Sequence, residues 1–314
     1  MRRLRTPALF AAILSLVLFG FAASSSRQAL AVGSQIRTFV ASTGSDANPC
    51  SRVAPCRTFG AALAQTAGGG EIVALDSGGY GAVTISQSVT IVAAPGVQAS
   101  ISPSSGSAIV VNAAPSDTVI LRNLNLNGQG GLYGVHYQAG GALHIEALSI
   151  NGFGNYGIQA SLSSAGMLYV ADTVSRNNGG GGIYLHSTSG TLNASVVRVR
   201  LEANAYNGLA AGDNTRVTVK DSVASGNLIG FAVLTDSTPA VLNLEGCVAS
   251  GNTSGIYAYG FSGTATVRVS NCTVTDNTSH GVLADTNGTI LSRGNNTVEG
   301  NNTNGSFSGS FAAK

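Results

Sequence analysis

Residues 242–259, LNLEGCVASGNTSGIYAY, and residues 267–284, VRVSNCTVTDNTSHGVLA, are two copies of one motif set 25 residues apart. Each copy begins with alternating apolar and polar residues, passes through an Asn, and ends with Gly followed by an apolar residue. Such alternation is typical of a half-buried β-strand, and no repeat shows the apolar spacing of a helix. The motif therefore predicts short strands joined by Gly/Asn turns.

One Gly–apolar pair recurs in seven successive units, at spacings of 23, 25, 26, 22, 25 and 26 residues. The seven pairs are Gly134-Val135, Gly157-Ile158, Gly182-Ile183, Gly208-Leu209, Gly230-Phe231, Gly255-Ile256 and Gly281-Val282. A period of this length indicates stacked units that cannot bury their apolar faces alone. Because parallel crossovers favour a right-handed path, we expect an all-β, right-handed parallel β-helix of about nine coils over residues 71–301.

An Asn precedes the repeat Gly by three or four residues in most copies. These residues are Asn178, Asn204, Asn227, Asn252 and Asn277. Asn tolerates the left-handed backbone of a sharp corner, and stacked amides can hydrogen-bond between coils. We therefore expect an Asn column at one corner of most coils.

The first 31 residues have the pattern of a secretory signal peptide. Arg2, Arg3 and Arg5 precede an apolar run over residues 8–23, and Ala29-Leu30-Ala31 provides a small-residue cleavage site. We expect the mature protein to be secreted, periplasmic or at the cell surface, and no later segment is apolar enough to span a membrane. A retained membrane anchor is the alternative left open.

Residues 32–70 are predicted to close the first coil, with a strand, a Cys50–Cys56 loop and a short helix. Thr58 is the expected N-cap of this helix, and the glycines at 68–70 are expected to end it. An amphipathic helix here would cover the open end of the solenoid. Residues 302–314, rich in Asn, Gly and Ser, are expected to be weakly ordered.

The four cysteines form two sequence pairs. Cys50 and Cys56 have a spacing that suits a local disulfide in an oxidising compartment. Cys247 and Cys272 lie one repeat apart, so we expect them to stack in adjacent coils. Their parallel Cβ vectors favour free buried thiols over a bridge, and neither pair has a His at metal-ligand spacing.

The chain resembles the right-handed parallel β-helix proteins of the pectate-lyase-like fold, in particular exported bacterial β-helix repeat proteins of unassigned activity. The resemblance rests on residues 50–59, CSRVAPCRTF, on residues 70–80, GEIVALDSGGY, and on the Asn/Gly coils after them. It covers residues 37–301. This fold carries lyases, hydrolases, epimerases and non-enzymatic adhesins, so the resemblance by itself assigns no activity.

One strip of side chains is predicted to face outward from the strands that follow each repeat Gly, because residues alternate between the two faces of a strand. The ligand-binding candidates on it are His136, Gln138, Gln159, Tyr184, His186, Tyr257, Tyr259 and Asp285. Flat rings and amides suit an extended sugar chain. The alternative is that these are ordinary strand-surface residues.

Composition narrows the possible functions. A net charge of +2 with 10% charged residues predicts no strong attraction to nucleic acid or anionic membranes. Glycoside hydrolysis needs two nearby carboxylates, and Asp285 is the only carboxylate on the strip. We therefore expect a protein that binds polysaccharide or cell-surface glycan without catalysis, metal or cofactor. A polysaccharide lyase, hydrolase or epimerase, with calcium in the lyase case, and a surface adhesin or structural repeat protein are the alternatives.

Overall fold

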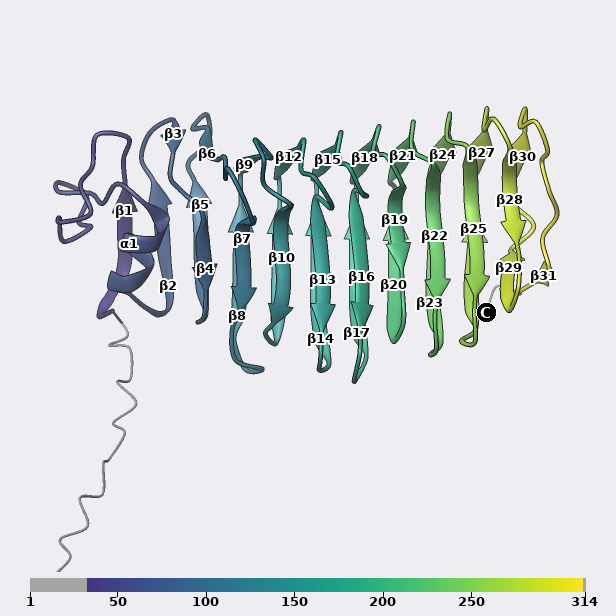
Figure 1. Cartoon of the computed structure of the whole chain (residues 1–314), viewed down its shortest axis with the longest axis horizontal. Coiled ribbons are helices and arrows are strands. Elements are labelled where there is room, and N and C mark those ends of the chain that lie inside the picture. Colours follow the sequence, from purple (N-terminus) through teal and green to yellow (C-terminus); the bar gives the residue numbers. More distant parts are fainter. Residues whose placement is uncertain (1–32, 313–314) are drawn as a thin grey trace, which may run out of the picture. The chain divides into compact units, whose positions relative to one another are not determined.

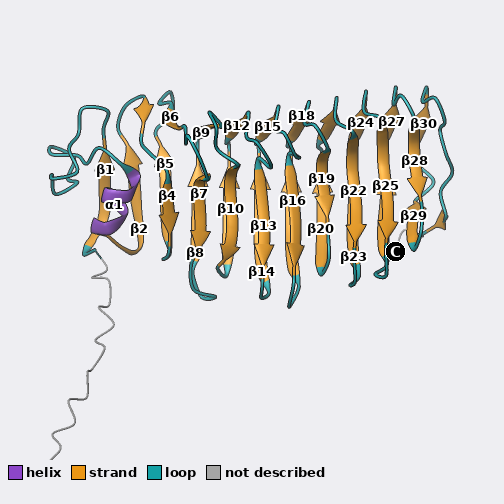
Figure 2. Ribbon diagram, in the orientation of Figure 1, coloured by secondary structure: helices purple, strands orange, loops and turns teal. Residues whose placement is uncertain are grey.

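The computed structural model describes residues 33–312, and the expected signal peptide at 1–31 lies outside the described residues. Residues 33–312 form a right-handed parallel solenoid of about nine turns, with three parallel sheets and one helix (Figures 1 and 2). Each full turn contributes one strand to each sheet, as the repeat predicts. The expected fold class is confirmed.

The three sheets are named A, B and C. Sheet A has twelve strands in the order β1 (Gln35–Val40), β2 (Thr66–Ala74), β5 (Val89–Ala93), β8 (Thr118–Arg122), β11 (Ala142–Glu146), β14 (Gly166–Ala171), β17 (Leu192–Val197), β20 (Thr215–Lys220), β23 (Ala240–Glu245), β26 (Ala265–Ser270), β29 (Gly288–Ser292) and β31 (Gly309–Ser310). Sheet B has ten: β3 (Gly78–Gly79), β6 (Ala99–Ile101), β9 (Leu124–Asn127), β12 (Ser149–Asn151), β15 (Val174–Arg176), β18 (Arg200–Glu202), β21 (Val223–Ser225), β24 (Val248–Ser250), β27 (Thr273–Thr275) and β30 (Thr297–Glu299). Sheet C has nine: β4 (Val83–Ile85), β7 (Ser107–Asn112), β10 (Tyr133–Ala139), β13 (Ile158–Leu162), β16 (Ile183–Ser187), β19 (Asn207–Ala211), β22 (Ile229–Thr235), β25 (Ser254–Gly260) and β28 (His280–Ala284).

The core is formed by the residues of each strand that face the interior of the solenoid. In β20, Val217 and Val219 are fully buried, whereas the intervening Arg216, Thr218 and Lys220 are exposed. Inward residues of all three sheets belong to one continuous apolar cluster. The alternation seen in the sequence therefore reports which face of each strand is buried.

The corners use left-handed backbone at fixed positions. Between sheets A and B, Asp172, Arg198, Asp221 and Asn271 each have φ near +50°. At the next corner, positive φ falls on the residue before each Asn of the predicted column, for example Asn177 (+54°). The expectation that the column residues themselves take this conformation is wrong, because their side chains turn inward instead.

The Asn column is a buried hydrogen-bonded ladder. Asn178 Nδ2 donates to Asn204 Oδ1 (2.8 Å), and the same bond links Asn227 to Asn252 (3.0 Å) and Asn252 to Asn277 (3.1 Å). The side-chain oxygen of each also accepts from the backbone N–H of the preceding Asn in the column. The ladder therefore satisfies both the donor and the acceptor of each buried side-chain amide.

The repeat Gly is required by close approach of the next turn. A Cβ at Gly255 would lie 2.6 Å from the carbonyl oxygen of Gly281 and 2.5 Å from a Val274 methyl group. No side chain fits at those distances. This explains why Gly precedes the apolar residue in each of the seven units.

Helix α1 (Phe59–Gln65) covers the first turn. Thr58 is its N-cap, accepting from the backbone N–H of Ala61, and Phe59, Ala62 and Leu63 are buried. The helix ends at Gln65, and the glycines at 68–70 lie within β2. They do not end the helix as the sequence suggested, because the chain pairs with β1 from Thr66 onward.

Two further features lie at the ends of the described chain. Cys50 and Cys56 form a disulfide in the loop before α1. At the other end, Gly309–Ser310 within the Asn/Gly/Ser tail pair with β29 as strand β31. Within residues 33–312, no helix has the length and apolarity to cross a membrane.

Candidate functional site

The outward strip predicted from the repeat lies on sheet C. Strand pairing aligns His136, Gln159, Tyr184, Ala210, Ala232, Tyr257 and Leu283 in one row across β10, β13, β16, β19, β22, β25 and β28. A second row lies two residues further along and contains Ser161, His186, Leu234 and Tyr259. The structure therefore places six of the predicted candidates in two rows on one face, in the register the sequence implied. The other two lie outside the paired register: Gln138 contacts His136, and Asp285 contacts Tyr257.

The first part of the strip surrounds His136. The Tyr133 ring lies 4.8 Å from the His136 ring, and Gln138 Nε2 lies 3.2 Å from His136 Nδ1. Asn155 Nδ2 donates to the Tyr133 hydroxyl at 3.1 Å. Burial lowers the pKa of His136, with a further contribution from the charge of His186. The imidazole is therefore neutral near pH 7 and acts as a hydrogen-bonding group.

A hydrogen-bonded chain joins the next two strands. Gln159 Nε2 donates to Ser161 Oγ (2.8 Å), and Ser161 Oγ lies 2.8 Å from His186 Nε2. Which of Ser161 Oγ and His186 Nε2 donates in this bond depends on the tautomer of the imidazole. Burial lowers the pKa of His186, which favours the neutral ring. The Gln159 Oε1 atom is buried without a hydrogen-bond partner among the described residues.

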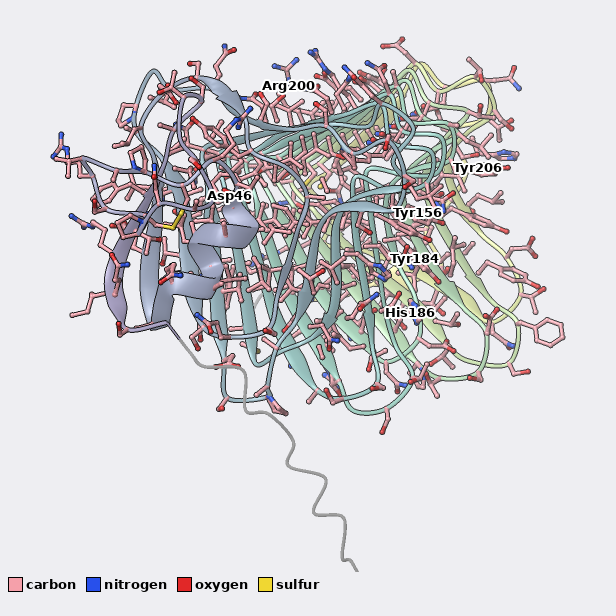
Figure 3. The ribbon with its side chains drawn as sticks, turned by 60° about the vertical axis from the view of Figure 1, so that its left-hand side comes forward. Asp46, Tyr156, Tyr184, His186, Arg200 and Tyr206 are labelled. Carbon is pink, nitrogen blue, oxygen red and sulfur yellow. A yellow bond between two sulfur atoms is a disulfide. The ribbon has the colours of Figure 1, made fainter. Side chains whose placement is uncertain are left out.

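Two tyrosine rings continue from the His186 end of this chain (Figure 3). The Tyr156 and Tyr184 rings stack at 5.1 Å, and the Tyr184 and His186 rings lie 5.4 Å apart. Burial raises the pKa of Tyr184, so its hydroxyl remains protonated and can donate. Tyr206 lies on the same side of the solenoid in Figure 3 and is 57% exposed.

Tyr133 and Tyr156 are members of the site that were missing from the sequence prediction. Each directly precedes its repeat Gly: Tyr133 is the first residue of β10, and Tyr156 lies in the turn before β13. The signal was therefore present in two successive units. It lies on the N-terminal side of the repeat Gly, whereas the predicted strip begins after the Gly.

The middle of the strip is not an open surface. Ala210 and Ala232 face outward by register but are fully buried. A Cβ at Gly212 would lie 3.3 Å from the Tyr184 hydroxyl and 3.2 Å from the His186 Cβ. The small residues on β19 and just after it therefore make room for the larger rings of the neighbouring turn.

A second aromatic cluster lies further along the solenoid. The Tyr257 and Tyr259 rings are stacked at 6.3 Å, and the Tyr257 hydroxyl lies 3.5 Å from Asp285 Oδ2. Three strand spacings separate Tyr257 from Tyr184, or about 14 Å. The strip therefore carries two separate aromatic clusters rather than a single one.

The charged groups near this face are carboxylates, Asp213 beside the strip and Asp285 at its end. The strands of sheet C contain no Lys or Arg. Asp213, next to the strip, accepts from the backbone N–H groups of Asp236, Ser237 and Thr238, so it holds a loop in place. In residues 33–312, no three His, Cys, Asp or Glu side chains are grouped in a way that could hold a metal ion.

The two remaining cysteines lie away from this face, at the corner between sheets A and B. Cys247 and Cys272 are buried and free, and the backbone N–H of Cys247 lies 3.4 Å from Cys272 Sγ. They occupy equivalent positions in successive turns. Both thiols therefore act as small core residues.

These features define a right-handed parallel solenoid with a polar-aromatic strip on one sheet. Residues 133–303 match the family model described as "right handed beta helix region", and the chain belongs to this family. Among solved structures, the pectate lyase Pel9A is similar at a TM-score of 0.59 and 15% identity, over 90% of this chain and 80% of that one. A rhamnogalacturonan lyase is similar at 0.53 and 12%, over 82% and 72%. No curated protein sequence matches the chain. At these identities the likeness shows the fold alone.

Proposed function

We propose that the protein binds a neutral polysaccharide along sheet C, with the chain of sugars lying across the strands. The observation that carries this proposal is the contiguous set of rings and amides formed by Gln159, Tyr156, Tyr184 and His186 over β13 and β16. Aromatic faces pack against sugar C–H surfaces, while amide and imidazole groups bond to hydroxyls.

The absence of Lys and Arg from the strands of sheet C favours a neutral over an acidic glycan. Recognition of carboxylate groups along a polymer normally uses arginine or lysine, because charge-assisted bonds are the strong ones. The two similar solved structures are lyases named for pectate and rhamnogalacturonan. Their names support a carbohydrate ligand in general, and the uncharged face supports a different subclass here.

Export is part of the proposal. The pattern of residues 1–31 is that of a signal peptide, and the Cys50–Cys56 disulfide suits an oxidising compartment. The mature protein would then meet glycans outside the cytoplasm, in the periplasm, at the cell surface or in the medium.

Binding is tested on soluble neutral oligosaccharides of glucose, xylose, mannose and galactose, with polygalacturonate as the acidic comparison. Tyr184→Ala should weaken binding to the best neutral ligand about tenfold, because it removes a stacking platform. Tyr169→Ala is the matched control, since Tyr169 is a tyrosine on sheet A that lies against a histidine ring, as Tyr184 does on sheet C. Equal effects of the two substitutions, or binding of polygalacturonate alone, would refute the proposal.

A catalytic function is the second candidate, favoured by the Gln159–Ser161–His186 chain. A neutral imidazole hydrogen-bonded to a hydroxyl is a suitable general base for proton abstraction, as in a lyase. Calcium belongs to this alternative only. The test is absorbance at about 235 nm and release of reducing ends, with and without calcium, for the wild type and for His186→Ala. Product that disappears in His186→Ala would establish catalysis at this site.

A further inference from the structure

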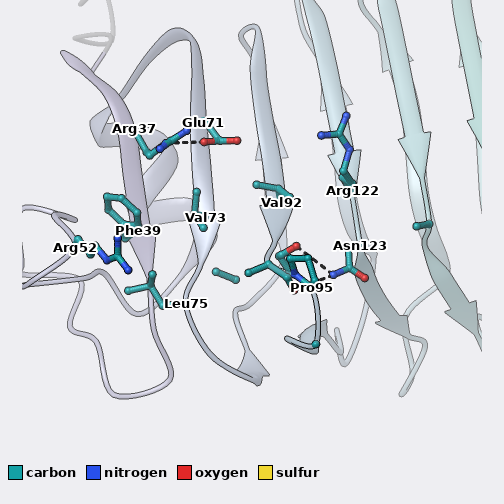
Figure 4. Close-up of a pocket in the computed structure, with 15 residues that line it drawn as sticks. Arg37, Phe39, Arg52, Glu71, Val73, Leu75, Val92, Pro95, Arg122 and Asn123 are labelled. Atoms are coloured by element: carbon teal, nitrogen blue, oxygen red, sulfur yellow. Dashed lines mark hydrogen bonds and ion pairs between the residues drawn. The ribbon is translucent and has the colours of Figure 1, made fainter.

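A pocket of about 790 Å³ opens on sheet A, at the end of the solenoid that carries the disulfide (Figure 4). It belongs to a different sheet from the polar-aromatic strip and shares no residue with it. Its lining comes from β1, β2, β5, β8 and the loop between Cys50 and Cys56. A volume of this size suits a small molecule.

The floor of the pocket is apolar where a solvent-facing sheet is normally polar. Phe39, Val73 and Val92 pair across β1, β2 and β5 in one outward row and are only half-buried. Leu75 and Pro95 extend the surface at the corner of the sheet. Contiguous exposed apolar surface of this kind marks binding sites more often than chance.

The rim of the pocket carries an excess of positive charge. Arg37 pairs with Glu71 at 2.6 Å, and Arg122 pairs with Glu146 at 2.7 Å. Arg52 also lines the pocket but forms no ion pair with any residue in 33–312. Three arginines against two glutamates leave one positive charge in excess, and Arg52 is the arginine that supplies it.

The disulfide loop connects Arg52 to the pocket floor. The backbone N–H of Phe39 donates to the Cys50 carbonyl (2.8 Å), and the Cys56 N–H donates to the Phe39 carbonyl (2.9 Å). The residues that flank Arg52 are therefore bonded to the strand that provides Phe39. The disulfide between Cys50 and Cys56 keeps the loop in this position.

We propose that this pocket binds a small organic anion, with its apolar body on Phe39, Val73 and Val92 and its acidic group at Arg52. The apolar floor would contact the body of the ligand, and the unpaired guanidinium of Arg52 would bind its acidic group. The site is independent of glycan binding on sheet C, so either proposal can fail without the other.

The test uses two probes of similar shape and different charge: the anionic 8-anilinonaphthalene-1-sulfonate and the neutral N-phenyl-1-naphthylamine. Fluorescence titration should show saturable binding of the anionic probe at one site. Arg52→Gln should weaken it about five- to tenfold, as loss of one charge-assisted bond predicts, and should leave the neutral probe within about twofold. Arg216→Gln, at an exposed arginine elsewhere on sheet A, is the matched control.

A second pair of variants separates the pocket from other apolar surface. Val73→Ser should weaken both probes, and the double substitution Cys50→Ala with Cys56→Ala should weaken the anionic probe more than the neutral one. The proposal is overturned if Arg52→Gln and Arg216→Gln bind the anionic probe equally. It is also overturned if the chain sediments as a dimer that does not bind the probe, because the pocket would then be covered by a second copy of the chain.

Discussion

Substitution of Asn252 by Ala tests whether the Asn ladder holds the turns of the solenoid together. Asn252 is buried and forms four side-chain hydrogen bonds. Its Oδ1 accepts from Asn227 N and Asn227 Nδ2, each at 3.0 Å, and its Nδ2 donates to Ala224 O (3.0 Å) and Asn277 Oδ1 (3.1 Å). An alanine removes all four bonds while leaving the backbone path unchanged.

The magnitude follows from which partners are left without a bond. Asn227 Nδ2 still donates to Leu201 O and Ser225 O, and Asn277 Oδ1 still accepts from the backbone N–H of residue 252. The backbone N–H of Asn227 is left buried without an acceptor, which costs about 1–3 kcal/mol. Net loss of the other three bonds adds about 0.5–1.5 kcal/mol each. We expect a total destabilisation of about 3–5 kcal/mol, short of the full sum because Asn227 Nδ2 keeps two acceptors.

Urea unfolding followed by circular dichroism measures this cost. Asn301→Ala is the matched control, because Asn301 forms the same ladder bond (2.7 Å) at the partly exposed end of the column, where water can replace it. We expect about 1 kcal/mol there. A cost below 1 kcal/mol for Asn252→Ala, or equal costs at the two positions, would show that the ladder is not a source of stability.

Three further predictions concern the core, the repeat glycine and the half-buried His186. Val233→Asp, at a fully buried position of β22, should cost several kcal/mol in thermal unfolding, and an unmoved transition would mean that the in/out register is wrong. Gly255→Ala should destabilise the fold by about 1–3 kcal/mol, because the added Cβ would overlap the Gly281 carbonyl. Gly60→Ala in helix α1 meets no close neighbour and should stabilise the fold by about 0.5–1 kcal/mol. The urea midpoints of the two variants should therefore move in opposite directions. Burial lowers the pKa of His186 below 6.5, so the unfolded chain binds the proton more readily than the folded chain does. The contribution of His186 to stability should be complete above about pH 6.5 and should fall as the pH drops toward the lowered pKa. The urea midpoint should therefore decrease between about pH 7.5 and pH 5, and by less in His186→Gln.

The repeat in the sequence was sufficient to predict the path of the chain. Each sequence signal corresponds to a local requirement of one turn. The Gly allows close backbone approach, the nearby Asn provides the corner amide, and the alternating strand provides a buried face. Stacking of equivalent residues then follows from the period alone, because parallel strands pair in register. For this reason the row from His136 to Leu283 and the neighbouring positions of Cys247 and Cys272 could be predicted by counting.

Features that depend on contacts between turns could not be predicted from the repeat period. Ala210 faces outward but is buried by larger neighbours, and the Asn178 side chain is inward while Asn177 takes the left-handed backbone. The sheet A pocket brings Arg52 from a loop to the face of Phe39, Val73 and Val92. The sequence by itself determined the solenoid, its register and the outward strip, because these are periodic. Only the tertiary structure decided which outward residues are exposed and which loops contact a strand face, because side-chain size and loop path do not follow the repeat.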